Sequence, residues 1–295
     1  MERAAGHEDT GKGEPTLYVV ATPIGNLKDI TLRALEVLRE VDVIAAEDTR
    51  VTSRLLNHYG IASRKLIALH EHNEQRTAPH VIELLGAGRS VALTSDAGTP
   101  AFSDPGARLV AAVREAGFTV VPIPGPNAAA AALSTSGFTG PRFLFYGFLP
   151  SKAGERRSAL DELESLPYVL VFYEAPHRIV ETLEALVSAF GGGRRIVIAR
   201  ELTKLFETIH VCALGEAVAA LTGDVDRQKG EFVLIVDAPA QPTDAAAEDV
   251  RRTLEVLLEA LPVKQAAALA ARITGARKNA LYDLALEMKR RRGEV

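Results

Sequence analysis

The fold of this chain is decided by the stretch LYVVATPIGNLKDIT, residues 17–31. The β-branched and aromatic run at 17–21 predicts a strand, and the Thr-Pro pair and glycine after it predict a tight loop. Residues 32–41 carry apolar side chains at helical spacing, with Asp29 or Thr31 as the expected N-cap. A strand, a loop and a helix in this order begin an α/β fold, in which ligands bind at the carboxyl ends of parallel strands. The loop at residues 22–31 is therefore a candidate site.

Length and composition indicate an intracellular globular protein of more than one domain. A chain of 295 residues exceeds what one hydrophobic core usually supports. Its one cysteine, Cys212, excludes an internal disulfide and favours a reducing compartment, so we expect a cytoplasmic protein in which Cys212 is a small buried side chain. No apolar run approaches the roughly 20 residues that cross a bilayer, so no membrane partner is expected. The net charge of −4 gives no argument for nucleic acid.

Strand-like and helix-like segments alternate along most of the chain, which predicts an α/β fold with parallel sheets. The punctuation Pro124-Gly125-Pro126-Asn127 marks a hinge, and the segment after residue 240 is helical throughout. We expect a disordered tail at 1–15, α/β domains at 16–126 and 127–240, and a helical, basic segment at 241–295. The expected strands are 17–21, 42–46, 67–69, 90–94, 119–123, 143–146, 168–173, 196–199, 207–212 and 231–236. The expected helices are 32–41, 52–58, 78–85, 109–116, 128–133, 155–163, 179–189, 216–221, 247–261, 264–273 and 278–291.

The loops after several expected strands are rich in glycine, proline and small polar residues. The segment SDAGTP at 95–100 offers main-chain donors and acceptors plus a carboxylate, suited to ribose hydroxyls or an amino group. The alternative is a stiff turn with a capping aspartate, since turns use the same residues. No G-x-G-x-x-G after the first strand, Walker lysine loop or G-x-S-x-G elbow occurs, which argues against the common dinucleotide, NTPase and hydrolase sites.

Three histidines and one charged cluster have two interpretations each. His70 and His72 are spaced to reach one metal ion from a strand, but no cysteine pair or H-E-x-x-H supports a metal site, and we predict none. Hydrogen bonding or a substrate-facing loop suits them better. His177 either caps and packs or contacts a ligand. The cluster at residues 200–204 is either a solvated face or part of a site at a strand end.

Seven segments, taken in order, resemble one family. The motifs are TPIGNLKDITLRAL (22–35), AEDTR (46–50), HEHNE (70–74), SDAGTPAFSDPG (95–106), PIPGPNA (122–128), FYEAPHRI (172–179) and ARELTKLFE (199–207). Together they resemble the bacterial small-subunit ribosomal RNA 2′-O-ribose methyltransferase I family, of the tetrapyrrole-methylase (class III) superfamily. The resemblance covers about residues 17–237 and continues in VKQAAALAARITGARKNALYDLAL (263–286).

The resemblance implies two α/β domains, S-adenosylmethionine in the cleft between them, and a homodimer. It also implies methylation of the ribose 2′-oxygen of a cytidine in the decoding centre of 16S rRNA, in the 30S ribosomal subunit. By analogy with the superfamily, we expect cofactor contacts from the loops 95–103 and 125–128 and from residues 173–175. Pro23, Gly25 and Asn26 are expected to line the floor of the cleft near the transferable methyl group. The expected cofactor-binding residues are Pro23, Gly25, Ser95, Asp96, Ala97, Thr99, Ala101, Phe102, Ser103, Pro126, Asn127, Ala128, Tyr173, Glu174 and Ala175.

Methyl transfer from a sulfonium needs no metal, but it needs alignment and exclusion of water. Because a ribose hydroxyl is a poor nucleophile near neutral pH, a positioned base or cation should assist. The base candidates are Glu47, Asp48 and Glu201. The candidate phosphate or oxyanion partners are Arg50, Arg178 and Lys204, and the expected RNA contacts are Asn26, Arg178, Lys264, Arg277 and Lys278.

The end of the chain bears on the choice of substrate. Between residues 263 and 292, eight basic residues face two acidic ones, a balance that reduces repulsion from phosphates. The alternative is a solvated helical face, but with the resemblance we expect docking on the ribosomal subunit. Two other functions stay open: a methyltransferase of the same fold with a small acceptor such as a tetrapyrrole, and a non-catalytic RNA-binding or ribosome-assembly protein.

Overall fold

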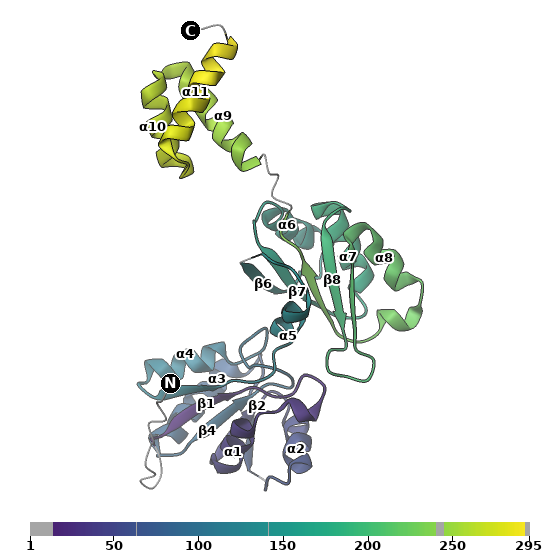
Figure 1. Ribbon diagram of the computed structural model, residues 1–295. Helices are drawn as coiled ribbons and strands as arrows, with labels where there is room; N and C mark the ends of the chain where they lie inside the picture. The colour runs from purple at the N-terminus through teal and green to yellow at the C-terminus, as the bar shows by residue number, and fades with distance from the viewer. Residues whose placement is uncertain (1–13, 63, 141, 240–244, 293–295) are drawn as a thin grey trace, which may run out of the picture. The chain divides into compact units, whose positions relative to one another are not determined.

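The computed structural model describes residues 14–62, 64–140, 142–239 and 245–292 (Figure 1). The chain divides into two compact units, Met1–Asp237 and Ala238–Val295. The first unit contains two five-stranded sheets. We call the part that carries the first sheet, residues 16–126, the first lobe, and the part that carries the second, residues 127–237, the second lobe. Most of the expected disordered tail, residues 1–13, lies outside the described residues.

The first lobe is a parallel sheet covered on both faces, as the alternating pattern predicted. Its strand order is β3-β2-β4-β1-β5, and every pair is parallel. Helices α1 and α2 cover one face and α3 and α4 the other (Figure 1), so the central strands β2 and β4 are buried along their whole length. The elements are β1 (Thr16–Val20), η1 (Leu27–Asp29), α1 (Leu32–Glu40), β2 (Val43–Ala46), α2 (Thr49–His58), β3 (Lys65–Ala68), α3 (Glu74–Gly86), β4 (Val91–Thr94), α4 (Ala107–Glu115) and β5 (Thr119–Ile123).

The second lobe departs from the predicted parallel sheet. In its order β6-β7-β10-β8-β9 only β6 and β7 are parallel, and the other pairs are antiparallel. The short segment 201–207 joins β8 to β9 without a crossover helix, and a parallel pair requires such a crossover. The elements are α5 (Ala128–Thr135), β6 (Phe143–Phe148), α6 (Ala153–Leu163), β7 (Val169–Glu174), α7 (Ile179–Phe190), β8 (Arg195–Arg200), β9 (Thr208–Ala213), α8 (Leu214–Thr222), η2 (Val225–Gln228) and β10 (Phe232–Val236).

Local side-chain caps fix where the helices begin. Of the two predicted caps for α1, Thr31 is the one used, because its Oγ1 accepts a hydrogen bond from Ala34 N at 3.1 Å. Asp29 instead lies in η1. Asn127 caps α5 by accepting from Ala130 N at 3.0 Å. Each bond satisfies a backbone N–H that the first turn of a helix leaves free.

The second unit is a bundle of three helices, α9 (Ala245–Ala260), α10 (Val263–Thr274) and α11 (Lys278–Arg292). Alanines 266, 267 and 270 of α10 let the helices approach closely and pack with Leu254 and Leu281. Gly275 ends α10 in the left-handed conformation, with a φ of 73°. None of the helices that the structure describes has the length and apolar character of a membrane span.

Candidate active site

A pocket of about 330 Å³ opens where loops of the two lobes meet. The first lobe contributes residues that follow β1 and β4, and the second contributes Asn127 and Ala128 after β5, the ends of β6, β7 and β8 and the start of β10. Its lining residues are Ile24, Ala97, Gly98, Thr99, Phe102, Ser103, Asp104, Asn127, Ala128, Phe148, Tyr173, Glu174, Ala175, Pro176, Leu202, Lys204, Glu231, Phe232 and Val233. The carboxyl ends of the parallel strands therefore form the site, as the fold class predicts.

The loops after β1 and β4 are tied together by their backbones. Thr22 N donates to Gly98 O at 2.8 Å, and Gly98 N donates back to Thr22 O at 3.0 Å. The buried Thr22 hydroxyl donates to Ser95 O at 3.0 Å. Because β1 and β4 are neighbouring strands, these bonds extend the sheet by one irregular bridge into the loops. They hold the segment 95–100 in place at the pocket.

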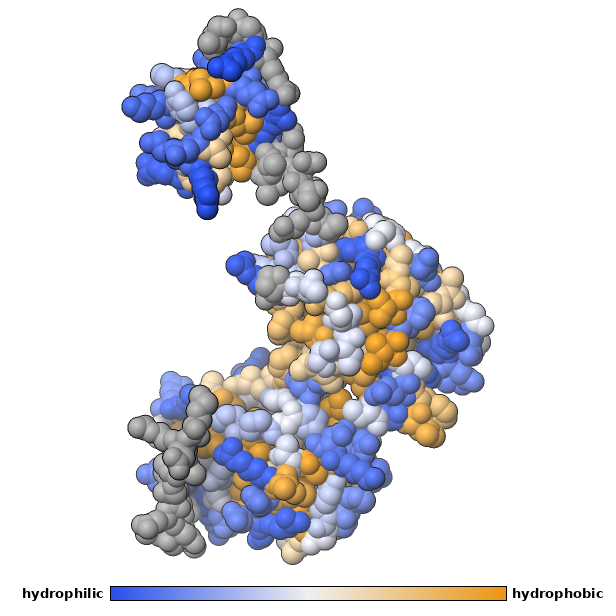
Figure 2. Space-filling model, viewed as in Figure 1, coloured by the Kyte–Doolittle hydropathy of each residue, from blue (hydrophilic) through white to orange (hydrophobic). Residues whose placement is uncertain are grey.

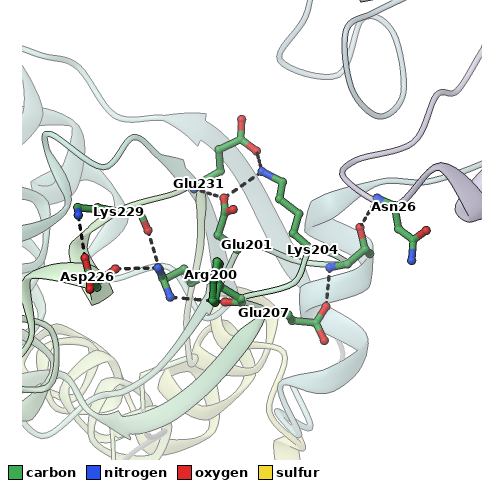
Figure 3. A network of polar contacts seen from close by, with 10 residues as sticks. Asn26, Arg200, Glu201, Lys204, Glu207, Asp226, Lys229 and Glu231 are labelled. Carbon is green, nitrogen blue, oxygen red and sulfur yellow. Dashed lines mark hydrogen bonds and ion pairs between the residues drawn. The ribbon is translucent and has the colours of Figure 1, made fainter. Parts of the chain in front are cut away.

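The loop after β1 also touches the second lobe. A Cβ at Gly25 would lie 2.5 Å from Lys204 Cγ and 3.1 Å from Leu202 O, so only glycine allows this approach. Beside it, Asn26 N donates to Thr203 Oγ1 at 3.1 Å (Figure 3). The glycine of the motif TPIGN thus joins the two lobes at the site.

Strained backbone conformations occur in two loops that line the pocket, the loop after β4 and the loop after β8. Four described residues other than glycine have positive φ angles: Ala101 (66°), Ser103 (65°), Glu201 (50°) and Thr203 (65°). The first two belong to the loop after β4 and the other two to the loop after β8, and both loops line the pocket. Such conformations cost about 1–3 kcal/mol each and cluster at functional sites. The strain therefore points to this pocket independently of its shape.

Four carboxylates form an acidic edge beside the pocket: Glu47, Asp48, Asp96 and Asp104. Glu47 Oε2 accepts from Asp96 N at 3.2 Å, and Asp96 Oδ1 accepts from Asp48 N at 3.0 Å. Burial, with the nearby Asp96 and Asp48, raises the pKa of Glu47. Burial and the charge of Glu47 raise the pKa of Asp104 to about 6. Only Asp104 of the four lines the pocket itself.

Asp48 and Arg50 are engaged with each other. Asp48 caps α2 and accepts from Arg50 N at 2.8 Å, while the Arg50 guanidinium makes an ion pair with its carboxylate. The hydrogen bonds from Arg50 lower the pKa of Asp48 to about 2. An acid so strong is a weak proton acceptor near neutral pH, so this geometry does not favour Asp48 as a base.

A second ion-pair group includes the pocket residues Lys204 and Glu231. Lys204 Nζ contacts Glu201 Oε1 at 2.9 Å and Glu231 Oε2 at 2.7 Å (Figure 3). Burial alone would raise the pKa of Glu201, but the hydrogen bond from Glu231 N and the Lys204 ammonium lower it overall. Burial would lower the pKa of Lys204, and the bonds to Glu231 and Glu201 raise it overall. The site therefore holds an ionised Glu201 and a charged Lys204.

The comparisons with known proteins agree with this fold and site. The family model described as Tetrapyrrole (Corrin/Porphyrin) Methylases matches residues 16–218. The chain belongs to the tetrapyrrole methylase family. It is therefore a methyltransferase, and a second model, described as the RsmI C-terminal HTH domain, matches residues 244–289.

The alignments with two similar proteins cover nearly the whole chain of the methylase. It is 52% identical to the "Ribosomal RNA small subunit methyltransferase I" of Escherichia coli O157:H7 over 96% of this chain and 99% of that one. It is also 52% identical to the protein of the same name from Pseudomonas aeruginosa, over 92% of this chain and 97% of that one. Among solved structures, the methyltransferase CobJ superposes with a TM-score of 0.58 at 23% identity, covering 77% of this chain and 95% of that one. That likeness shows the shared fold.

Most of the predicted cofactor contacts meet at the pocket of the methylase. Those that line it are Ala97, Thr99, Phe102, Ser103, Asn127, Ala128, Tyr173, Glu174 and Ala175, together with Lys204 from the predicted catalytic set. Those that are not among the lining residues are Pro23, Gly25, Ser95, Asp96, Ala101 and Pro126, with Glu47, Asp48, Arg50 and Glu201. Their roles toward the cofactor and in catalysis stay predictions.

Two predicted contacts use their charged groups inside the second lobe. The Glu174 side chain is fully buried and accepts from Thr182 Oγ1 at 2.6 Å and Ala175 N at 2.8 Å. The Arg178 guanidinium lies 3.4 Å from Glu174 and donates to Leu149 O at 2.6 Å. Its side chain is only 18% exposed. The RNA contact predicted for Arg178 therefore gains no support from its geometry.

The sequence reasoning did not select nine residues that line the pocket. Five of them, Ile24, Gly98, Asp104, Pro176 and Leu202, stood within the quoted motifs, and that was the signal that could have found them. The other four lie at or beside strand ends whose direction the pattern did not show. The nine are Ile24, Gly98, Asp104, Phe148, Pro176, Leu202, Glu231, Phe232 and Val233.

The residues with two interpretations lie apart from the pocket, except for the cluster at 200–204. Across the described ranges, no three His, Cys, Asp or Glu side chains gather as a metal site requires. His70 N instead donates to Asn73 Oδ1 at 2.8 Å at the start of α3. His177 is exposed, and Cys212 is half-buried on β9 rather than fully buried as expected.

Proposed function

We propose that this methylase transfers the methyl group of S-adenosylmethionine to the ribose 2′-oxygen of a cytidine in the decoding centre of 16S rRNA. The observation that carries the proposal is the identity of about 50% with proteins named ribosomal RNA small subunit methyltransferase I, over nearly the full length of both chains. That likeness includes the helical unit as well as the two lobes. With ribosomal RNA as the substrate, the proposed place of action is the cytoplasm.

The pocket fits the proposed cofactor. Its volume of about 330 Å³ lies within the range of about 300–1,000 Å³ typical of small-molecule sites. Apolar walls from Ile24, Leu202 and Val233 suit an adenosine, and the Asp104 carboxylate suits a cationic sulfonium or amino group. The loop 97–103 would hold the cofactor from the first lobe, and Asn127 and residues 173–175 from the second. When bound, S-adenosylmethionine supplies a methyl group already activated on a sulfonium.

The remaining chemistry falls to side chains of the chain. Of the three proposed bases, Glu47 is the one whose pKa burial raises, and a higher pKa favours acceptance of the proton of a ribose hydroxyl. Asp104 belongs to the same acidic edge and lines the pocket, so we add it as a second candidate for the base. Asp48 and Glu201 are already paired with cations. Lys204 is charged and lines the pocket, in place to contact a phosphate or the developing oxyanion.

The helical unit supplies the proposed RNA contacts outside the pocket. Lys264, Arg277 and Lys278 are exposed. The last two stand where the turn after Gly275 leads into α11. A short turn containing glycine between two helices is typical of helix-turn-helix units, whose second helix meets nucleic acid with its first residues. We propose that this end of α11 contacts rRNA.

We also propose a homodimer, with the open edge of β9 as the surface that a second copy covers. β9 is the last strand of its sheet and exposes Ile209 and Val211, and the preceding loop exposes Leu205 (89%) and Phe206 (67%). Figure 2 shows apolar side chains on the surface of the lobe that carries the second sheet. An apolar strand edge invites pairing with another chain. If the proposal holds, Phe206→Glu yields a monomer in light scattering; an unchanged mass would contradict this surface, and a monomeric wild type would contradict the dimer.

The test of the function is transfer of a labelled methyl group to isolated 30S subunits, followed by mapping of the modified nucleotide. A single labelled ribose in the decoding centre is expected. Label on a tetrapyrrole but not on rRNA would favour the small-molecule alternative. Cofactor binding without transfer to either acceptor would favour a non-catalytic role.

A further inference from the structure

A row of four aromatic rings runs from the first lobe to the mouth of the pocket. Phe102 stacks on Phe145 with 4.2 Å between ring centroids, and Phe145 meets Tyr173 edge-on at 5.0 Å. Tyr173 in turn meets Phe148 at 5.7 Å. The first three rings pack against the apolar core of the second lobe. Phe148 lines the pocket but is 52% exposed, so one end of the row is open to a ligand.

An irregularity in β6 puts Phe148 there. Phe145 pairs with Val171, but the next pairs are Gly147 with Phe172 and Phe148 with Tyr173, which leaves Tyr146 as an extra residue. In an unbroken register Phe148 would pair with Glu174 and its side chain would lie on the opposite face of the sheet. The bulge therefore turns Phe148 to the face that carries Tyr173 and the pocket.

Glycine makes this bulge possible. Gly147 has a φ of 82°, a conformation that side chains rarely adopt. A Cβ at this position would also lie 2.8 Å from Ser103 Oγ, in the strained loop of the first lobe. The bulge is thus packed against the loop after β4, which lines the pocket, and this contact fixes the position of the Phe148 ring at the site.

An exposed ring at this position suits a nucleobase. Sequence-specific recognition of RNA mostly targets unpaired nucleotides, whose bases can leave the stack and commonly lie on aromatic side chains. Lys204, on the same pocket, offers a positive charge to the phosphate backbone of such a nucleotide. The interior of the pocket is left for the proposed cofactor.

We propose that Phe148 is the platform on which the base of the target nucleotide stacks while its ribose faces the methyl donor. The proposal rests on the proposed function, since it requires an RNA acceptor. It makes Phe148 a substrate-binding residue with no part in holding the cofactor. Stacking of one base is worth about fivefold to 150-fold in affinity.

The experiment compares Phe148→Ala, Phe148→Trp and the control Phe143→Ala. Phe143 lies on the same strand and is 58% exposed, but it is not among the pocket residues. Two quantities are measured for each variant: the Kd for S-adenosylmethionine by calorimetry without RNA, and kcat/KM for 30S subunits. We expect Phe148→Ala to lower kcat/KM at least fivefold with an unchanged cofactor Kd, Phe148→Trp to lose clearly less than Phe148→Ala, and Phe143→Ala to stay within twofold of wild type.

Each other outcome overturns the proposal in a recognisable way. A cofactor Kd that rises as much as kcat/KM falls would assign the ring to the cofactor site. An unchanged kcat/KM in Phe148→Ala would mean that the base stacks elsewhere, while the methyltransferase function stands. Equal losses in Phe143→Ala would indicate a general effect on β6. A wild-type protein that binds the cofactor but leaves 30S subunits unmethylated would end the proposed function, and this proposal with it.

Discussion

Gly25 of the first lobe lies against Lys204 of the second so closely that a Cβ on the glycine would be 2.5 Å from Lys204 Cγ. The same Cβ would lie 3.0 Å from Thr203 Oγ1 and 3.1 Å from Leu202 O. One of these contacts is with the backbone oxygen of Leu202, so turning a flexible side chain would not make room for a Cβ at residue 25. The contact sets how closely the two lobes approach at the pocket.

Gly25→Ala should therefore displace the loop 201–204 and weaken both halves of the site. We expect a loss of about 1–3 kcal/mol in the free energy of unfolding, typical of overpacking, and a fall in methyl transfer of at least tenfold. Urea unfolding and the transfer assay measure the two effects. Gly154→Ala is the matched control, because a Cβ there meets nothing within 4 Å and the residue is helical. Full activity in Gly25→Ala would show that the lobes do not depend on this contact.

The Glu74 side chain, from the motif HEHNE, stabilises the end of the loop after β4 and the start of α4. Its buried carboxylate accepts from Gly106 N at 3.1 Å and from Leu109 N at 2.9 Å, at the beginning of α4. The negative charge also suits the amino end of that helix. We expect Glu74→Ala to cost about 2–4 kcal/mol in the free energy of unfolding, since it leaves two buried donors without partners. Glu74→Gln keeps an acceptor and should cost less.

Chemical unfolding in urea measures the Glu74 series. The exposed neighbour Glu71 provides the control, and Glu71→Ala should change stability by no more than about 0.5 kcal/mol. If Glu74→Ala were as stable as wild type, water or another group would have to satisfy the two donors, and the assigned role would be wrong.

Much of the fold was predictable from the sequence because it depends on local patterns. The caps Thr31 and Asn127 and the parallel first sheet followed from residue types and spacing. The antiparallel strands of the second lobe did not, because an apolar run has no direction. The role of Glu74 depends on donors 32 and 35 residues further along the chain. The place of Phe148 depends on a single extra residue in β6, which reverses the face of everything after it.

We expect the Asp104 carboxylate to lower the stability of the protein near neutral pH while it contributes to methyl transfer. Its surroundings are Ser95 and Asp96 after β4, Glu47 after β2 and Tyr173 on β7, and burial with the Glu47 charge raises its pKa from 3.8 to about 6. The folded state thus binds the proton more tightly than the unfolded chain does. The resulting stabilisation is complete below pH 4 and is lost as the pH rises through 6.

Asp104→Asn should therefore stabilise the protein at pH 7.5 by about 1 kcal/mol, a value discounted for solvent screening, and give no gain at pH 4. Methyl transfer should fall at least tenfold if the carboxylate accepts a proton or faces the sulfonium. Urea unfolding at both pH values tests the first statement. The exposed Asp161→Asn in α6 should show no such pH-dependent difference. A variant with wild-type activity would remove Asp104 from the catalytic candidates.

We expect basic residues of the helical unit to contribute to the salt dependence of binding to 30S subunits. Arg277 and Lys278 are exposed at the start of α11, and each phosphate contact adds about 0.7–0.9 to the slope of log Kd against log salt. Arg277→Ala combined with Lys278→Ala should lower the slope for 30S binding by about 1.5 and weaken binding most at low salt. The control is Lys65→Ala, exposed at the amino-terminal end of β3, the end of the sheet opposite to the site. Because the proposed cofactor site lies within the lobes, the Kd for the cofactor should stay unchanged in the double variant. Equal slopes for the double variant and wild type would mean that α11 does not meet RNA with these residues.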